Sequence, residues 1–292
     1  MTEHLEHNSL GNPEYQQAVT EQTAPDWRRL EVATHRFNEY LNDGINAALL
    51  TERPIGPGIA RCIANILGRS LGPASALAEY GRTGEGSYQA LREEYLSLYW
   101  HPAAPAQAQE LVDWFGTHLI QKIYPEAVTA TGTPEQPRTL ANLLVPTGIQ
   151  VSSRYSVVHV PGNCNQNAID NLTIKLAELD FDKDASLRAH LMRPRVNAVS
   201  DDVIGGFESV FVGAWPSREQ ALAAICDVAQ RSYEVQEYAA LRRIYVNEMT
   251  ADFEALEEDT AGAYDFVETH GMHHVFQQLE TLNPDEMKGG EL

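Results

Sequence analysis

The stretch EAVTATGTPEQPRT, residues 126–139, divides the chain into two parts that differ in sequence pattern. Its residues are mostly small and polar and include two prolines, a composition typical of linkers between domains. The whole chain has 292 residues, of which 43% are hydrophobic and 21% are charged. This length and apolar content predict one large domain or two ordinary domains with packed cores.

Before the linker, residues 25–125 are predicted to form a helical domain. Apolar residues recur at three- and four-residue spacing from Trp27 to Leu41, which is the pattern of one buried helix face. Aromatic side chains at helical spacing are expected to fill the contacts between helices. Residues 1–24 are polar, have no apolar period and are interpreted as a flexible arm. Further helices are expected over residues 59–67, 73–80, 87–100 and 108–124, and the aromatic set comprises Tyr95, Tyr99, Trp100, Trp114 and Phe115.

After the linker, residues 140–292 alternate between strand and helix patterns. YSVVHV, residues 155–160, is short and β-branched, and FESVFVGAW, residues 207–215, is the clearest strand pattern in the chain. A helix pattern follows each of them, and helical sequence is expected to continue from Ser217 to about residue 258. The predicted fold class is therefore α+β, with a helical N-terminal domain followed by a smaller α/β domain that has an acidic helical C-terminus.

Composition excludes several classes of protein. Cys62, Cys164 and Cys226 are far apart and odd in number, so we expect neither a disulfide framework nor a cysteine zinc site. Residues 1–17 have neither the basic nor the apolar region of a signal peptide. No stretch approaches the roughly 18 consecutive apolar residues of a membrane-spanning helix. We expect a cytoplasmic protein that does not contact a membrane, and we predict no cofactor and no bound metal.

The chain is strongly acidic, with 41 Asp and Glu residues against 21 Lys and Arg residues and a net charge of −20. Such a charge repels phosphate groups, so direct binding of nucleic acid is not expected. Fourteen acidic residues and three basic residues fall within residues 234–292, so the acid is concentrated near the C-terminus. Such a distribution indicates either a solubilising surface or a surface that docks onto a basic partner.

Residues 247–270 are expected to carry this surface. Met249, Phe253 and Leu256 have the spacing of an apolar helix stripe, and acidic residues cover most of the remaining positions. Like charges four residues apart destabilise a helix, so we hypothesise that a basic partner protein offsets the repulsion. In one form of this hypothesis, the acidic face imitates the phosphate array of DNA and blocks a nucleic-acid-binding protein. The predicted partner-binding residues are Glu248, Asp252, Glu254, Glu257, Glu258, Asp259, Asp265 and Glu268.

An enzyme is the principal alternative. Cys164 lies in a polar turn before a predicted helix, whose N-terminus would favour the thiolate, and His159 precedes it by five residues. His270 would share a helix face with His273 or His274, a spacing that metal ligands use, although no further ligand can be identified. The third alternative is a structural protein that forms homo-oligomers.

Two further patterns are interpreted as structural. A cluster of arginines is expected to form ion pairs with aspartates a few residues upstream. A glycine-rich loop lacks the preceding strand and the lysine of a phosphate-binding loop, so it is expected to be a turn between helices. The arginines are Arg188, Arg193 and Arg195, the aspartates are Asp180, Asp182 and Asp184, and the glycines are Gly81, Gly84 and Gly86.

Overall fold

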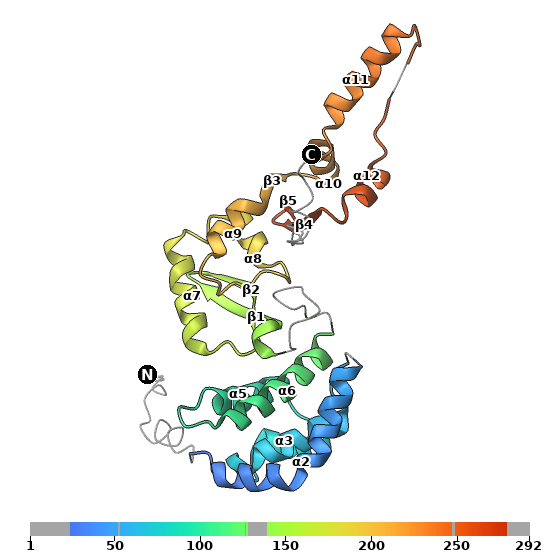
Figure 1. Ribbon diagram of the computed structural model, residues 1–292. Helices are drawn as coiled ribbons and strands as arrows, with labels where there is room; N and C mark the ends of the chain where they lie inside the picture. Colours follow the sequence, from blue (N-terminus) through green and yellow to red (C-terminus); the bar gives the residue numbers. More distant parts are fainter. Residues whose placement is uncertain (1–23, 52, 126, 128–138, 247–248, 279–292) are drawn as a thin grey trace, which may run out of the picture. The chain divides into compact units, whose positions relative to one another are not determined.

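The computed structural model describes residues 24–51, 53–125, 127, 139–246 and 249–278. The chain divides into two compact units, residues 1–125 and residues 126–292. Within the described ranges, the N-terminal unit is helical and the C-terminal unit combines helices with two small antiparallel sheets (Figure 1). The predicted α+β class with a helical N-terminal part is confirmed. Most of the predicted arm and of the predicted linker lies outside the described residues.

Local sequence sets the helix ends in the N-terminal unit. The Asp26 carboxylate accepts a hydrogen bond from the backbone N–H of Arg29, and Ser75 Oγ accepts one from Ala78, so both residues act as N-caps. Pro57 occupies the first turn of its helix, and Gly84 ends another in the left-handed conformation. The helices are α2 (Trp27–Leu50), α3 (Pro57–Leu71), α4 (Ala76–Thr83), α5 (Tyr88–Tyr99) and α6 (Ala106–Ile123).

The core of this unit forms where α3 packs against α2, α4 and α6, and where α5 packs against α6. The ring of Phe115 makes edge-to-face contacts with Tyr80 and Tyr95, at centroid distances of 5.4 and 6.3 Å. Tyr95 and Phe115 are fully buried, as predicted. Trp100 is instead 48% exposed, because α5 ends at Tyr99 and Trp100 is the C-cap residue.

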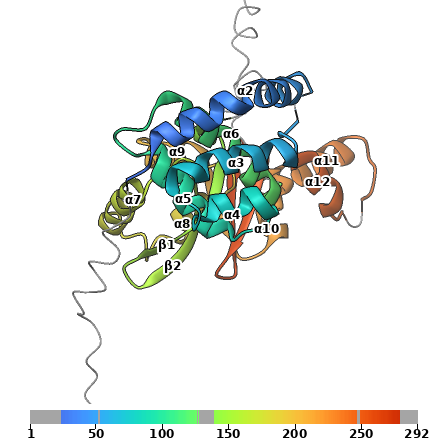
Figure 2. The same ribbon diagram turned by 90° about the horizontal axis from the view of Figure 1, so that it is seen from below.

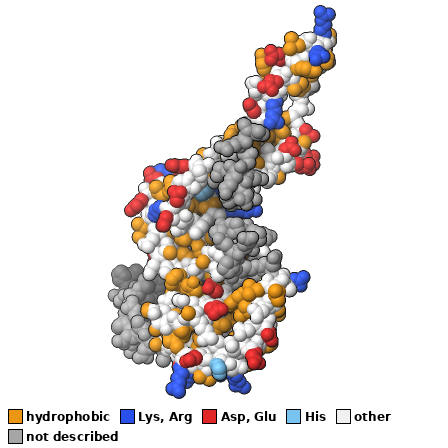
Figure 3. Space-filling model, viewed as in Figure 1, with side chains coloured by type: hydrophobic (Ala, Val, Ile, Leu, Met, Phe, Trp, Pro, Cys, Tyr) orange, Lys and Arg blue, Asp and Glu red, His pale blue; other side chains and the backbone are white. Residues whose placement is uncertain are grey.

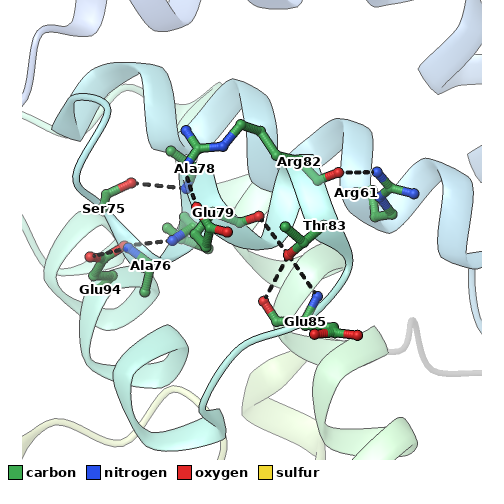
Figure 4. A network of polar contacts seen from close by, with 10 residues as sticks. Arg61, Ser75, Ala76, Ala78, Glu79, Arg82, Thr83, Glu85 and Glu94 are labelled. Atoms are coloured by element: carbon green, nitrogen blue, oxygen red, sulfur yellow. Dashed lines mark hydrogen bonds and ion pairs between the residues drawn. The ribbon is translucent and has the colours of Figure 1, made fainter.

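Helices α3 and α4 approach each other closely at two glycines. A Cβ atom at Gly68 would lie 2.5 Å from the backbone nitrogen of Ala78, and one at Gly81 would lie 2.8 Å from Asn65. Gly81 is therefore a helix-packing residue rather than part of a phosphate-binding loop. The amides at the start of α4 are already bonded, since Glu94 accepts from Ala76 N at 2.7 Å and from Leu77 N at 2.8 Å (Figure 4).

The C-terminal unit begins with a β-hairpin that packs on helices. β1 and β2 are antiparallel, pairing Leu144 with Pro161 at one end and Val151 with Arg154 at the other. Their inward-facing residues share a core with apolar residues of α7, including Ile169. The elements are a 3-10 turn (Leu140–Asn142), β1 (Leu144–Val151), β2 (Arg154–Pro161), α7 (Gln166–Glu178), α8 (Ala185–Leu191), α9 (Val203–Val210), β3 (Phe211–Trp215), α10 (Arg218–Ile225), α11 (Val228–Leu241), α12 (Phe253–Thr260), β4 (Tyr264–Thr269) and β5 (Met272–Gln277).

The second sheet has the strand order β3-β5-β4, with both pairs antiparallel. The strand predicted over 207–215 is wrong in its first half. Residues up to Val210 belong to α9, and only the strand Phe211–Trp215 pairs with β5. The run expected to stay helical to residue 258 is also interrupted, since α11 ends at Leu241 and α12 begins at Phe253.

The segment that follows α12 is a β-hairpin, not a helix. Its turn is formed by His270 and Gly271, both with positive φ, +54° and +72°. A two-residue turn with two positive φ values matches the right-handed twist of antiparallel strands. Of the segment predicted to form an acidic helix, only the part that forms α12 is helical. No helix in the described ranges combines the length and the apolar character needed to cross a membrane.

Candidate functional site

Helix α12 and its N-cap residue, Asp252, carry five of the eight acidic residues singled out by the sequence. The helix packs against α10, and the carboxylate of Asp252 caps it by accepting a hydrogen bond from Ala255 N at 3.1 Å. Figure 3 shows carboxylate groups gathered over this helix on the face in view. Glu248 lies outside the described residues. The predicted residues that are exposed are Asp252, Glu254, Glu258, Asp259 and Glu268.

Glu257 is used within the protein. Its carboxylate lies 2.6 Å from the guanidinium of Arg218 in α10, and that guanidinium also lies over the ring of Phe266 in β4 at 4.6 Å. Both side chains of the ion pair are partly exposed, so the pair contributes little to the free energy of folding. The pair nevertheless connects α12 with α10, and Arg218 connects both with the hairpin.

Asp265 is also paired within the protein. Arg193 Nε and Nη2 both donate to Asp265 Oδ2, at 3.0 and 2.5 Å, and Gln278 donates to Oδ1 at 2.7 Å. Only 10% of the Arg193 side chain is exposed, and its guanidinium lies 4.9 Å from the centre of the Phe276 ring. The predicted pairing of the arginine cluster with the upstream aspartates is therefore wrong for Arg193.

Arg188 differs from the same prediction in another way. It donates from Nη1 to the backbone carbonyls of Phe181 and Asp182, both at 2.8 Å, and not to the aspartate carboxylates. The residue is buried beside the segment that precedes α8, where two carbonyls accept from Nη1, whereas Nε is buried without a hydrogen-bond partner among the described residues. Burial lowers the pKa of Arg188.

Apolar side chains lie exposed along α11 and the residues that follow it. Helix α11 packs against α10, and Ala239 is its only buried residue. Figure 3 shows apolar side chains along this helix, and the exposed fractions reach 79% at Leu241 and 93% at Tyr245. A run of this kind marks an interaction surface more often than isolated exposed residues do. The exposed residues are Tyr233, Val235, Tyr238, Leu241, Ile244, Tyr245 and Val246.

The histidines do not share a helix face. His270 lies in the hairpin turn, whereas His273 and His274 are neighbours on β5 and point to opposite sides of the sheet. His274 is buried, and its Nδ1 lies 3.1 Å from Ser186 Oγ. Arg154 Nη1 lies 3.3 Å from His270 Nε2, and this positive charge disfavours a metal cation there. Among the described residues, no three His, Cys, Asp or Glu side chains are grouped as metal ligands.

Cys164 lies in the turn between β2 and α7, as predicted, but it is buried in the apolar core of the unit. Its Sγ is 3.6 Å from the backbone carbonyl of Asn165, and Asn165 is the N-cap of α7, accepting from Ala168 N at 2.9 Å. His159 lies in β2, and burial lowers its pKa. These surroundings are typical of a packing cysteine.

The N-terminal unit contains a pocket that the sequence did not predict. It has a volume of about 840 Å³ and is lined by residues of α2, α3 and α4 and of the turn at Gly72 and Pro73. Five arginines line it, but only Arg28, Arg29 and Arg36 share one helix. The spacing of these three arginines on α2 was visible in the sequence. Arg69 and Arg82 are brought to the same pocket only by the packing of α3 and α4.

No family model matches the chain, and the comparisons with curated proteins and with solved structures also give no match. Function is therefore inferred from the residues and their surroundings.

Proposed function

We propose that the C-terminal unit is a protein-binding module that docks onto a basic surface of a partner protein. The observation that carries this proposal is the exposed apolar run on α11, which lies in the same unit as the exposed carboxylates of α12. Interfaces commonly combine large apolar or aromatic anchors with a polar rim. The exposed tyrosines Tyr233, Tyr238 and Tyr245 supply such anchors. The carboxylates of α12 supply negative charge that complements a basic partner surface.

Ion pairs within the chain reduce the number of carboxylates that a partner protein could contact. Glu257 and Asp265 are engaged by Arg218 and Arg193, so we assign them to holding the unit together. The carboxylates left for a partner include Glu254, Glu258 and Asp259 on α12. In the DNA-mimic form of the proposal, the partner is a nucleic-acid-binding protein whose phosphate-binding side chains contact these carboxylates.

The test compares two variants that remove equal charge. E254Q/E258Q/D259N neutralises three exposed positions of α12, and E31Q/E39Q/D43N neutralises three exposed positions of α2. Partner proteins captured from a cell extract should be lost with the α12 variant and at high salt, and retained with the α2 variant. Purified partner binding to both variants with equal affinity would refute the role of α12.

Self-association through α11 is the second candidate function. Residues 228–246 contain Arg231, Arg242 and Arg243 against Glu234 and Glu237, so this segment lacks the negative charge of the rest of the chain. In an antiparallel pair of α11 helices centred on Tyr238, Glu234 of one copy is level with Arg242 of the other. A two-fold axis would repeat this contact and bury both apolar runs.

Light scattering over a range of concentrations separates the two candidates. A concentration-dependent dimer that is lost in Y238S/L241S favours self-association. A monomer at every concentration excludes self-association and leaves α11 for a different partner.

A further inference from the structure

We propose that the arginine-lined pocket of the N-terminal unit binds a small phosphate-bearing ligand with an apolar or aromatic body, of the nucleoside-phosphate class. This inference concerns a different unit from the proposed docking surface and does not depend on it.

The pocket is formed by the packing of three helices. α2 and α4 both pack on α3, which lies between them in Figure 2. Gly68 of α3 lines the pocket, and its lack of a side chain is what allows Ala78 of α4 to approach. The volume of about 840 Å³ is within the range of small-molecule sites. The pocket therefore has room for a ligand of nucleotide size.

Positive charge converges on this pocket although the chain as a whole is acidic. Residues 1–125 contain nine Lys and Arg residues against 15 Asp and Glu residues, and five of those nine cations line the pocket. Among the described residues that line the pocket, Asp26 is the only acidic one. Like charges held together repel each other, and a bound anion removes that repulsion. The arginines are Arg28, Arg29, Arg36, Arg69 and Arg82.

Two of these arginines already have carboxylate partners. Arg29 Nε lies 3.0 Å from Asp26, and Arg82 is paired with Glu79, as Figure 4 shows. Arg28, Arg36 and Arg69 are exposed and form no ion pair with any carboxylate in the described ranges. The guanidinium of Arg36 lies over the ring of Phe37, 5.6 Å from its centre, a contact that leaves its N–H groups able to donate. These three guanidinium groups can therefore bind phosphate oxygens, which arginine does in a bidentate geometry.

The remaining lining residues define the body of the ligand. Val32, Phe37, Pro73 and Ala78 provide apolar surface, and Val32 is 65% exposed. A ligand with an apolar or aromatic group would cover this surface while its phosphates contact the arginines. A short ligand is favoured over nucleic acid, because the repulsion from a chain of net charge −20 grows with the charge of the ligand.

Isothermal titration calorimetry with ATP, pyrophosphate, adenosine and a single-stranded DNA oligonucleotide tests the assignment. ATP should bind more tightly than pyrophosphate or adenosine, and its affinity should fall as salt is raised from about 50 to about 300 mM. R28Q/R36Q/R69Q should weaken ATP binding by at least about tenfold, since each guanidinium contributes a charged hydrogen bond. The matched control R53Q/K183Q/R195Q neutralises three exposed cations elsewhere and should change the affinity by less than about twofold.

A second variant, Val32→Glu, places a carboxylate at an exposed pocket position and should also weaken ATP binding. Circular dichroism checks that both pocket variants remain folded. The proposal is overturned if no probe binds, or if the pocket variants and the control bind ATP equally well. Equal affinity for ATP and pyrophosphate would overturn the apolar part of the assignment, and tighter binding of the oligonucleotide would overturn the assignment to a small ligand.

Discussion

Removing the carboxylate of Asp265 should destabilise the C-terminal hairpin far more than removing any carboxylate of the proposed docking surface. Asp265 on β4 receives two hydrogen bonds from Arg193 and one from Gln278. Arg193 is 10% exposed and would keep its charge in Asp265→Ala without a carboxylate to balance it. The cost of the variant is therefore mainly that of an unpaired guanidinium.

The size of this effect follows from the burial of the two partners. Removing one member of a fully buried ion pair costs about 3–5 kcal/mol. The Asp265 side chain is 32% exposed, so water can solvate part of the site in the variant. A charged hydrogen bond contributes about 1.5–3 kcal/mol, and we expect a loss of about 2 kcal/mol. Such a loss corresponds to roughly 30-fold faster exchange of the hairpin amides when they exchange by local opening.

Hydrogen–deuterium exchange of β4 and β5 measures this loss within the intact chain. The matched control is Asp259→Ala on the exposed face of α12. It should change the free energy of opening, as measured by exchange of the hairpin amides, by less than about 0.5 kcal/mol. In an Arg193→Met background, the effect of Asp265→Ala should shrink, because no charge is left unpaired. Protection in Asp265→Ala equal to that in Asp259→Ala would refute the assignment of Asp265 to stability.

Two further predictions concern stability elsewhere in the chain. Gly68→Ala should lower the melting temperature by forcing α4 away from α3, at about 1–3 kcal/mol. Gly206→Ala, within α9 and with open space at its Cβ position, should not lower it, because alanine favours a helix more than glycine does. Equal melting temperatures of the two variants would contradict the close packing. His190 has a pKa lowered from 6.5 to about 4 by burial and by the charge of Arg193. The unfolded chain therefore binds this proton more readily, so stability should fall as pH drops from about 6.5 towards 4, and His190→Gln should reduce that slope in thermal scans at several pH values.

Sequence predicted the helices of the N-terminal unit because their signals are local. The apolar spacing from Trp27 to Leu41 and the cap at Asp26 need no information from distant residues. The same holds in the C-terminal unit for the cap of α10 at Ser217. The hairpin of β4 and β5 was missed because its strands are short and follow an acidic helix pattern. The pair His270–Gly271 was the available signal, since glycine favours the positive φ of a two-residue turn.

The candidate sites were harder to predict than the elements because they depend on contacts between distant residues. Arg193 and Asp265 are 72 positions apart, and the aspartates nearer to Arg193 in sequence looked like better partners. The same limit applies to the arginine pocket, where Arg28 and Arg82 meet only after α2 and α4 have packed on α3. Exposure of the apolar residues on α11 was likewise not predictable, because their spacing equally fits a buried helix.

The two proposed sites have opposite charge, and this makes them separable by experiment. Salt should weaken both interactions, so salt dependence alone does not identify either site. Neutralising Glu254, Glu258 and Asp259 removes the charge that a basic partner would contact, but it also reduces the overall repulsion of anions by the chain. The α12 variant should therefore lose the partner protein while binding ATP as well as the wild type or slightly better. A variant that lost both would indicate a folding defect, and circular dichroism would reveal it.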